Sequence, residues 1–283
     1  MYKQKKFDTL ITAKSNPFKL NLKETARYKD LIWLFVQRDF KTKYKQTILG
    51  PLWFIIQPLL TTFIFTIVFG QIAKLSTDGV PQFLFYLAGN VPWLFFSSCL
   101  TRTSATFYEN IRLFGRVYFP RIAVPISTVI TCFFNFLIQF VMFVIIDLIL
   151  ILTGANTHIT WYAALFPLLI LELGILGMGV GIIISSLTVK YRDLQVLVSF
   201  GMQLWMYISP VVYSVSSIEN TTLKTLIMLN PVSPVIEFMR AGWLGVGTTN
   251  WMCLGISLAV TAVIAFLGLV IFNKTEKNFM DKI

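Results

Sequence analysis

Six long apolar runs, separated by shorter polar stretches, decide what this chain can fold into. The chain is 56% hydrophobic and only 13% charged, with a mean hydropathy of +0.72, which is typical of an integral membrane protein. A helix of about 20 apolar residues crosses a bilayer and satisfies its own backbone hydrogen bonds there. We therefore predict an all-α integral membrane protein with six transmembrane helices. The predicted spans cover residues 52–72, 83–100, 124–152, 162–188, 194–215 and 251–272.

The lysines and arginines predict how these spans are oriented. With both termini in the cytoplasm, 21 basic residues lie on the inner side, and Lys74, Lys224 and Arg240 lie on the outer side. Basic residues accumulate on the cytoplasmic side of membrane proteins, so this multi-pass orientation is favoured. It also accounts for the formal net charge of +11 without a nucleic-acid partner. No apolar stretch precedes Leu31, so no cleavable signal peptide is expected.

A basic amphipathic segment, residues 28–47, comes directly before the first span. On a helix, its apolar side chains share one side and its basic side chains share the other, as in a helix that lies in a membrane interface. Lys43 and Leu34 depart from this pattern, and Gly50-Pro51 ends the helix. The apolar side carries Ile32, Trp33, Val36, Phe40 and Tyr44, and the basic side carries Arg38, Lys41 and Lys45.

Residues 216–250, between the fifth and sixth spans, are too long for a simple turn. Two apolar pieces, 223–229 and 235–244, are each too short to cross a bilayer, and Pro231 and Pro234 separate them. We predict a re-entrant or interfacial helical hairpin on the outer side, in which Glu237 and Arg240 neutralise each other. An ordinary external loop that lies on the bundle is the alternative.

The sequence offers no catalytic constellation, so the chain is not expected to be an enzyme. His158 is the single histidine, and no GxxxxGK[ST] phosphate loop is present. The three cysteines, Cys99, Cys132 and Cys253, lie in apolar segments without metal-ligand spacing. The glycines at 174–181 indicate close helix packing, because Gly177 and Gly181 have the GxxxG spacing. A membrane-bound glycosyl or acyl transferase is disfavoured, because histidines and clustered acids are lacking.

Two acids lie within predicted spans, Asp147 and Glu172. A carboxylate inside a membrane is costly and is a functional candidate by default. One interpretation is a proton relay, which would make the protein a proton-coupled secondary transporter. The other, which we favour, is a protonated or hydrogen-bonded carboxyl group that faces the bundle or a hydrated lumen. Aromatic residues make up 15% of the chain, and aromatic rings inside a channel would suit the passage of sugar chains.

Several segments together resemble the permeases of ABC-2 type transporters. The closest likeness is to the membrane subunits of polysaccharide ABC exporters of the O-antigen type, with teichoic-acid and capsule exporters as cousins. Blocks in the order of that family extend over most of the chain, from residue 28 to residue 272. They are residues 38–58, 89–98, 116–121, 189–194, 204–213 and 229–240.

The resemblance implies an assembly and a task. Such permeases are six-span homodimers in the bacterial inner membrane, and two copies of a separate ATP-binding cassette subunit hold ATP and Mg. This chain would then need no cofactor and would export lipid-linked polysaccharide to the outer face. Residues 1–27 would be a cytoplasmic tail, and 28–283 the transmembrane domain with a cytoplasmic tail at 273–283. An ABC-2 exporter of drugs or lipids is the main competing interpretation.

The resemblance also implies roles for particular residues. Three groups follow, for coupling to the ATPase, for lining the channel and for closing the outer gate. The coupling candidates are Arg38, Lys41, Glu109, Arg112, Leu113, Phe114, Arg116, Tyr191 and Arg192, with Leu113 and Phe114 expected to dock in an ATPase groove. The channel-lining candidates are Phe54, Phe65, Trp93, Phe136, Glu172 and Trp205. The gate candidates are Pro231, Pro234, Glu237 and Arg240.

Overall fold

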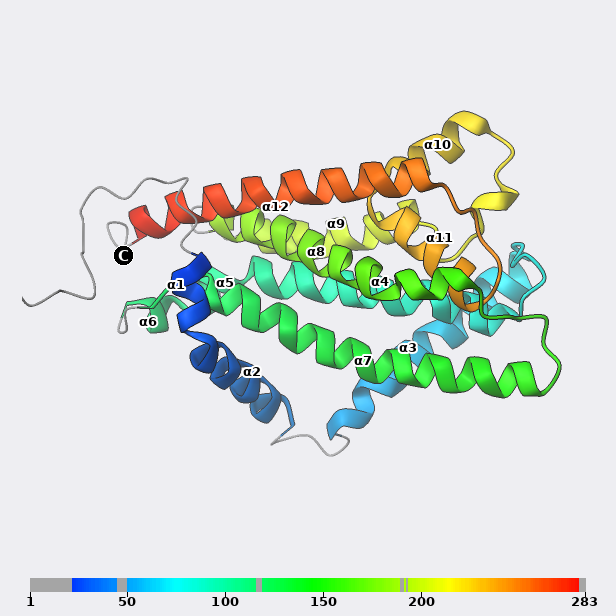
Figure 1. Ribbon diagram of the computed structural model, residues 1–283, viewed down its shortest axis with the longest axis horizontal. Coiled ribbons are helices and arrows are strands. Elements are labelled where there is room, and N and C mark those ends of the chain that lie inside the picture. Colours follow the sequence, from blue (N-terminus) through cyan, green and yellow to red (C-terminus); the bar gives the residue numbers. More distant parts are fainter. Residues whose placement is uncertain (1–21, 45–49, 116–118, 189–190, 192, 280–283) are drawn as a thin grey trace, which may run out of the picture.

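The computed structural model describes residues 22–44, 50–115, 119–188, 191 and 193–279, and every regular element in this part is helical (Figure 1). The predicted all-α class is therefore confirmed. The first half of the chain forms α1 (Leu22–Arg27), α2 (Lys29–Tyr44), η1 (Gly50–Leu52), α3 (Trp53–Phe65), η2 (Thr66–Ile72), α4 (Gln82–Ser104), α5 (Thr106–Glu109), α6 (Ile111–Phe114) and α7 (Ala123–Leu152). The second half forms η3 (Trp161–Leu165), α8 (Phe166–Thr188), α9 (Leu194–Ile208), η4 (Val215–Ser217), α10 (Thr221–Leu229), α11 (Val232–Trp243) and α12 (Trp251–Phe279).

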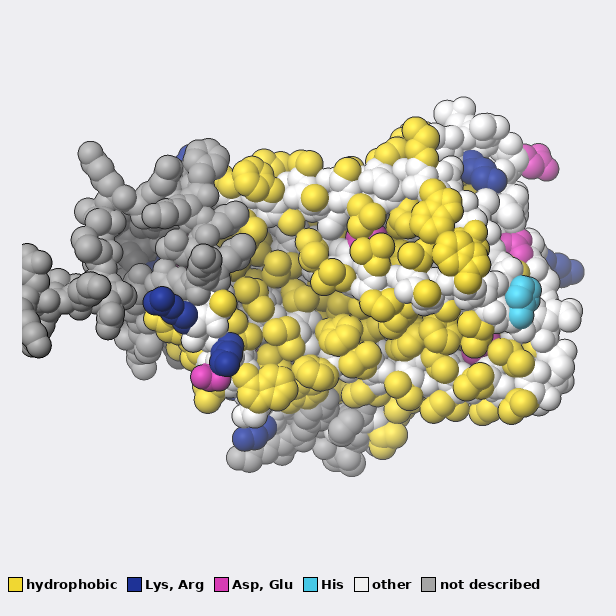
Figure 2. Space-filling view, in the orientation of Figure 1, with side chains coloured by type: hydrophobic (Ala, Val, Ile, Leu, Met, Phe, Trp, Pro, Cys, Tyr) yellow, Lys and Arg dark blue, Asp and Glu magenta, His cyan; other side chains and the backbone are white. Residues whose placement is uncertain are grey.

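Five helical segments of the described part are long and apolar enough to cross a membrane. They correspond to the first four predicted spans and the sixth. Figure 2 shows the accompanying surface, a broad hydrophobic band across the visible face with charged side chains gathered mainly at its two ends. The five segments are Trp53–Ile72, Gln82–Ser104, Ala123–Leu152, Trp161–Thr188 and Trp251–Glu276.

The predicted fifth span, residues 194–215, is shorter than expected. Its helix α9 has 15 residues and ends at Ile208, because Ser209 adopts an extended backbone before Pro210. At 1.5 Å per residue such a helix covers roughly 22 Å, less than the hydrocarbon core of about 30 Å. The count of six spans is therefore not confirmed by helix length.

Helix α4 is the centre of the bundle, and α8 packs against it through glycines. A Cβ atom added at Gly177 would lie 2.8 Å from Cβ of Cys99, and one at Gly181 would lie 2.7 Å from Cβ of Thr103. The close packing predicted from the GxxxG spacing is thus confirmed. Gly268 of α12 approaches the other side of α8, where an added Cβ would lie 2.8 Å from the carbonyl oxygen of Gly179.

We expect Gly181→Ala to destabilise the protein, although alanine favours helices over glycine. The new methyl group must push α4 and α8 apart, and overpacking of this kind costs roughly 1–3 kcal/mol. Gly255→Ala is the matched control, because a Cβ atom added there on α12 meets nothing within 4 Å. This variant only gains the higher helix propensity of alanine. Thermal unfolding in detergent should show a lower midpoint for Gly181→Ala only. Equal midpoints for both variants would contradict this account of the α4–α8 contact.

The segment between α9 and α12 forms two short helices, α10 and α11, near the two predicted apolar pieces. The break lies at Asn230-Pro231, whereas Pro234 fits within the first turn of α11, where the missing N–H has no helical partner. Residues 232–242 of α11 are buried among other helices, and α10 lies further out (Figure 1). These helices lie at the opposite end of the bundle from α1, α2, α5 and α6.

Candidate functional site

Helix α2, the predicted interface helix, lies against α7 at one end of the bundle. The rings of Trp33 and Phe40 meet Phe134 of α7, at centroid distances of 6.2 and 5.9 Å. Val36 is buried as the helical pattern predicts, but Trp33 stays 51% exposed and Phe35, outside the predicted apolar side, is buried. The helix is therefore rotated slightly from the predicted orientation. Arg38 and Lys41 are exposed, as a role in partner contact requires, and the side chain of Tyr44 lies outside the described part.

Five phenylalanines beneath α2 form what we call the Phe107 cluster. Phe107, from the loop after α4, stacks on Phe272 near the end of α12 at a centroid distance of 4.8 Å. Phe114 of α6 lies 5.9 Å from both Phe107 and Phe119, and Phe35 of α2 lies 5.6 Å from Phe119. The cluster joins α2, α5, α6 and the last turns of α12.

Phe114 is 3% exposed, so its ring does not project toward a partner. Helices α5 and α6 turn the ring inward, into the Phe107 cluster, and docking of Phe114 in an ATPase groove stays a prediction. Leu113 is only partly buried against the same cluster. Tyr108, Glu109 and Tyr191 are exposed at this end. The side chain of Arg112 and the residues Arg116 and Arg192 lie outside the described part.

Three ion pairs that the sequence did not predict lie at this end. Asp39 of α2 lies 2.9 Å from Arg38 and 3.2 Å from Arg102 in the last turn of α4. The guanidinium of Arg121 donates to the carbonyl oxygen of Glu276 at 2.9 Å and lies near the Glu276 carboxylate. Burial lowers the pKa of Arg121, and Glu276 opposes that shift. Asp39, an isolated acid among basic residues, was the one signal that could have suggested the first pair.

The channel-lining candidates are mostly enclosed within one chain. Phe65, Trp93, Phe136 and Glu172 are buried, with Phe136 packed 5.0 Å from Phe95. The large aromatic rings face inward because they fill the space between α4, α7 and α8. Phe54 and Trp205 are only partly buried. Trp205 borders an apolar groove of about 300 Å³ between α4, α8 and α9.

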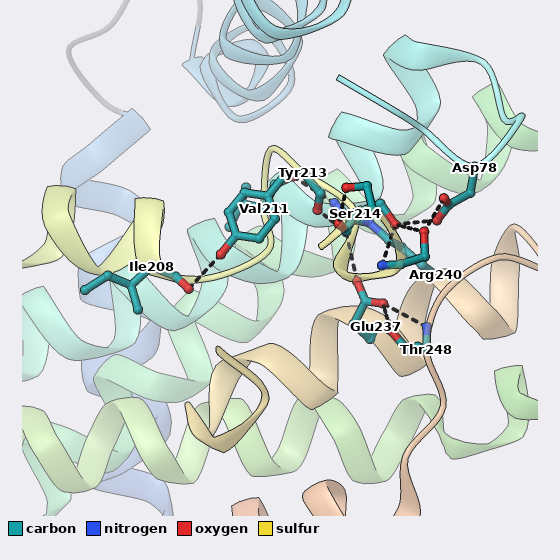
Figure 3. A network of polar contacts seen from close by, with 10 residues as sticks. Asp78, Ile208, Val211, Tyr213, Ser214, Glu237, Arg240 and Thr248 are labelled. Carbon is teal, nitrogen blue, oxygen red and sulfur yellow. Dashed lines mark hydrogen bonds and ion pairs between the residues drawn. The ribbon is translucent and has the colours of Figure 1, made fainter. Parts of the chain in front are cut away.

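At the other end, Arg240 of α11 anchors a buried polar network (Figure 3). Its side chain is fully buried and pairs with Glu237 at 3.1 Å, as predicted from their spacing. The guanidinium also donates to the carbonyl oxygens of Val211 at 2.8 Å and Tyr213 at 3.3 Å. It lies 3.8 Å from the ring centre of Phe85, a cation–π distance. Arg240 thereby fixes the chain after α9 onto α11 and α4.

The network extends to two loops on either side. Glu237 accepts hydrogen bonds from the backbone N–H and the hydroxyl of Thr248, both at 2.8 Å. Asp78, in the loop before α4, accepts from the hydroxyls of Ser214 and Ser216. The loop before α12 is thus tied to α11, and the loop before α4 is tied to the segment after α9, which Arg240 in turn holds through the carbonyl oxygens of Val211 and Tyr213.

Tyr213 lies at the edge of this network. Its hydroxyl donates to the carbonyl oxygen of Ile208 at 2.9 Å, which caps the end of α9. The role of Asp78 could not be predicted from the sequence, because its partners Ser214 and Ser216 are remote along the chain.

Comparison with known proteins agrees with this architecture. Residues 30–244 match the model of the ABC-2 type transporter family. The O-antigen export system permease protein RfbA of Klebsiella pneumoniae is 29% identical over 252 residues, covering 89% of this chain and 94% of that protein. The Myxococcus xanthus protein of the same name is 27% identical over 264 residues, with coverages of 93% and 98%. The polysialic acid transport protein KpsM of Escherichia coli is 26% identical over 247 residues, with coverages of 86% and 92%.

Proposed function

Because the chain belongs to the ABC-2 type transporter family, we propose that it is the permease subunit of an exporter of lipid-linked polysaccharide. The substrate would be O-antigen-like and would move from the cytoplasmic to the outer face of the bacterial inner membrane. The observation that carries this proposal is the near full-length similarity to relatives named as O-antigen export permeases. The similarity to a polysialic acid transport protein makes capsule export the second candidate.

The energy for export would come from a separate subunit. Two copies of this chain would pair with two ATP-binding cassette subunits, which would hold ATP and Mg. Both termini would lie in the cytoplasm, where the basic residues of α2 favour the inner membrane surface. To complete a sixth span, residues 209–215, which turn after α9 and lead into η4, would continue the path of α9 toward the outer face.

The end of the bundle that carries α2 would receive the push from the ATPase. The exposed side chains of Tyr108, Glu109 and Tyr191, with the basic face of α2, are the surface offered to the partner. Phe114 would contribute indirectly, because its buried ring anchors α6 to the Phe107 cluster. Movement of the loop after α4 would then pass into α2 and α12 through that cluster, as packed elements shift against one another.

The opposite end would form the outer gate. Helices α10 and α11 would close the exit, and the Arg240 network would hold α11 in the closed position. Pro231, at the junction between the two helices, would serve as the bend, and the ion pair of Glu237 and Arg240 would allow both charges to lie inside the protein. An opening movement of α11 would have to break the hydrogen bonds from Arg240 to Val211 and Tyr213, or move the segment after α9 together with α11.

Depletion of the chain in its native cell tests the proposed substrate. Lipid-linked glycan should accumulate on the cytoplasmic face and disappear from the cell surface, and mass spectrometry of the accumulated lipid would separate O-antigen from capsule. Unchanged surface glycan together with lost efflux of drugs or lipids would replace the proposal with the other kind of ABC-2 exporter.

A further inference from the structure

Glu172, the buried acid of α8, belongs to a series of three residues in contact, Glu172, Ser257 and Pro231, that ends at the hairpin of α10 and α11. It is 2% exposed, and its Oε1 lies within hydrogen-bond distance of Oγ of Ser257 on α12, itself 1% exposed. The same Oγ lies 2.6 Å from the carbonyl oxygen of Pro231, immediately before α11. The hydroxyl of Ser257 therefore bridges the carboxyl group of α8 and the beginning of the gate helix.

The number of protons shared by Glu172, Ser257 and Pro231 decides the direction of the two hydrogen bonds between them. A serine hydroxyl has one proton to donate, and a peptide carbonyl oxygen can only accept. If Ser257 donates to Pro231, as the 2.6 Å distance indicates, the contact between Ser257 and Glu172 needs a second proton. Only the carboxyl group of Glu172 can supply it. With an ionised Glu172, one of the two contacts would bring two oxygens together without a proton between them.

The surroundings of Glu172 also favour the protonated form. Within the described part of the chain, no lysine, arginine or histidine forms an ion pair with Glu172, and its Oε2 has no hydrogen-bond partner. Removing an ionised carboxylate from water without a cation or further donors is costly. A protonated carboxyl group avoids that cost and uses its proton in the bond to Ser257.

We infer that Glu172 stays protonated and donates to Ser257, which in turn donates to Pro231 and so fixes the beginning of α11. Glu172 is then a positioning residue of the hairpin and not a proton carrier. The adjacent Asn230 is bound from the other side, since it accepts from Nε1 of Trp205 and donates to Oγ of Ser209. The junction between α10 and α11 is thus held by α8, α9 and α12 together, and the hairpin has a fixed pivot.

Infrared spectroscopy of the purified protein tests the protonation directly. The wild-type spectrum should contain the carbonyl stretching band of a protonated carboxylic acid that is absent from Glu172→Gln. Asp147→Asn is the control for assignment, because Asp147 is the other acid buried in a spanning helix. Loss of that band in Glu172→Gln supports the inference. A Glu172→Gln spectrum that keeps every protonated-acid band of the wild type would overturn it, and neither result depends on what is transported.

Stability measurements test the positioning role. Glutamine keeps a donor to Ser257, so Glu172→Gln should unfold in detergent like the wild type. Glu172→Leu should lower the ratio of folded to unfolded protein about fivefold, the effect of one lost hydrogen bond, and Ser257→Ala should lower it further, because it removes the bonds to both Glu172 and Pro231. The double variant should lose little more than Ser257→Ala alone, since Ser257→Ala already removes both bonds. A Glu172→Gln protein as unstable as Glu172→Leu would contradict the role as donor.

Export measurements separate positioning from proton transport. Glu172→Gln should export glycan at the wild-type rate, because the glutamine amide replaces the donated bond without a transferable proton. A stable Glu172→Gln protein that no longer exports would show that Glu172 releases its proton during transport, and the inference would be abandoned. If the wild type exports no glycan at all, the proposed function fails, while the infrared and stability results still decide the role of Glu172.

Discussion

Replacing Arg240 by methionine is expected to destabilise the protein by about 3–5 kcal/mol, the usual cost of breaking a buried ion pair from one side. The side chain is fully buried, so the variant leaves the carboxylate of Glu237 inside the protein without its cation. The carbonyl oxygens of Val211 and Tyr213 also lose their donor. The predicted result is a markedly lower unfolding midpoint in detergent and a loosened hairpin between α10 and α11.

A double variant distinguishes loss of the pair from loss of packing. Glu237→Gln combined with Arg240→Met removes both charges, and replacing a buried pair by neutral side chains is often close to neutral in stability. The double variant should therefore recover much of the stability that Arg240→Met loses. If the single and double variants unfold at the same midpoint, the destabilisation comes from the lost packing on Phe85 and the lost bonds to Val211 and Tyr213, and not from the unpaired charge.

Phe107→Ala is expected to have the second largest effect, a loss of about 3–5 kcal/mol, as for other phenylalanines removed from a core. Phe107 is completely buried and stacks on Phe272, so the truncation leaves a cavity between the loop after α4 and the end of α12. Phe114→Ala should cause a loss of the same kind, because Phe114 belongs to the same cluster. In both variants, the midpoint of thermal unfolding and the amount of ATP-binding subunit retained on the tagged protein should both decrease.

The comparison of these two variants decides whether Phe114 acts from inside or by docking. Phe107 has no exposed surface with which to contact a partner, so any loss of partner binding in Phe107→Ala must arise from the cluster itself. Tyr108→Ala is the exposed control, since its side chain is 49% exposed and should leave the unfolding midpoint unchanged. If Phe114→Ala loses the partner while unfolding like the wild type, Phe114 docks directly after all.

Much of the fold could be predicted from patterns that are local in the sequence. The five long spans follow from apolar length, and the α4–α8 contact follows from the spacing of Gly177 and Gly181. The pairing of Glu237 with Arg240 follows from their separation by one helical turn. Each of these features depends on residues that are near neighbours along the chain, so periodicity and spacing contain the necessary information.

The features that the sequence did not reveal depend on partners far away in the chain. Phe114 packs on Phe107 and Phe119, but the cluster that encloses all three rings is completed by Phe35 of α2 and Phe272 of α12, which are far away in the sequence. The hydroxyl partners of Asp78 lie in the segment after α9. The early end of α9 is different, since Pro210 was visible in the sequence, but the continuous apolar run through residue 215 outweighed it in the prediction.

We propose that this chain works as a permease driven by a separate ATPase that contacts the end of the bundle carrying α2. The most direct measurement is purification of the tagged chain from its native membrane, with a crosslinker on the exposed position Glu109→Cys, and identification of what is bound. We predict a stoichiometric ATP-binding cassette subunit, crosslinked through position 109. A purified chain that contains no such ATPase, even after crosslinking, would contradict the account.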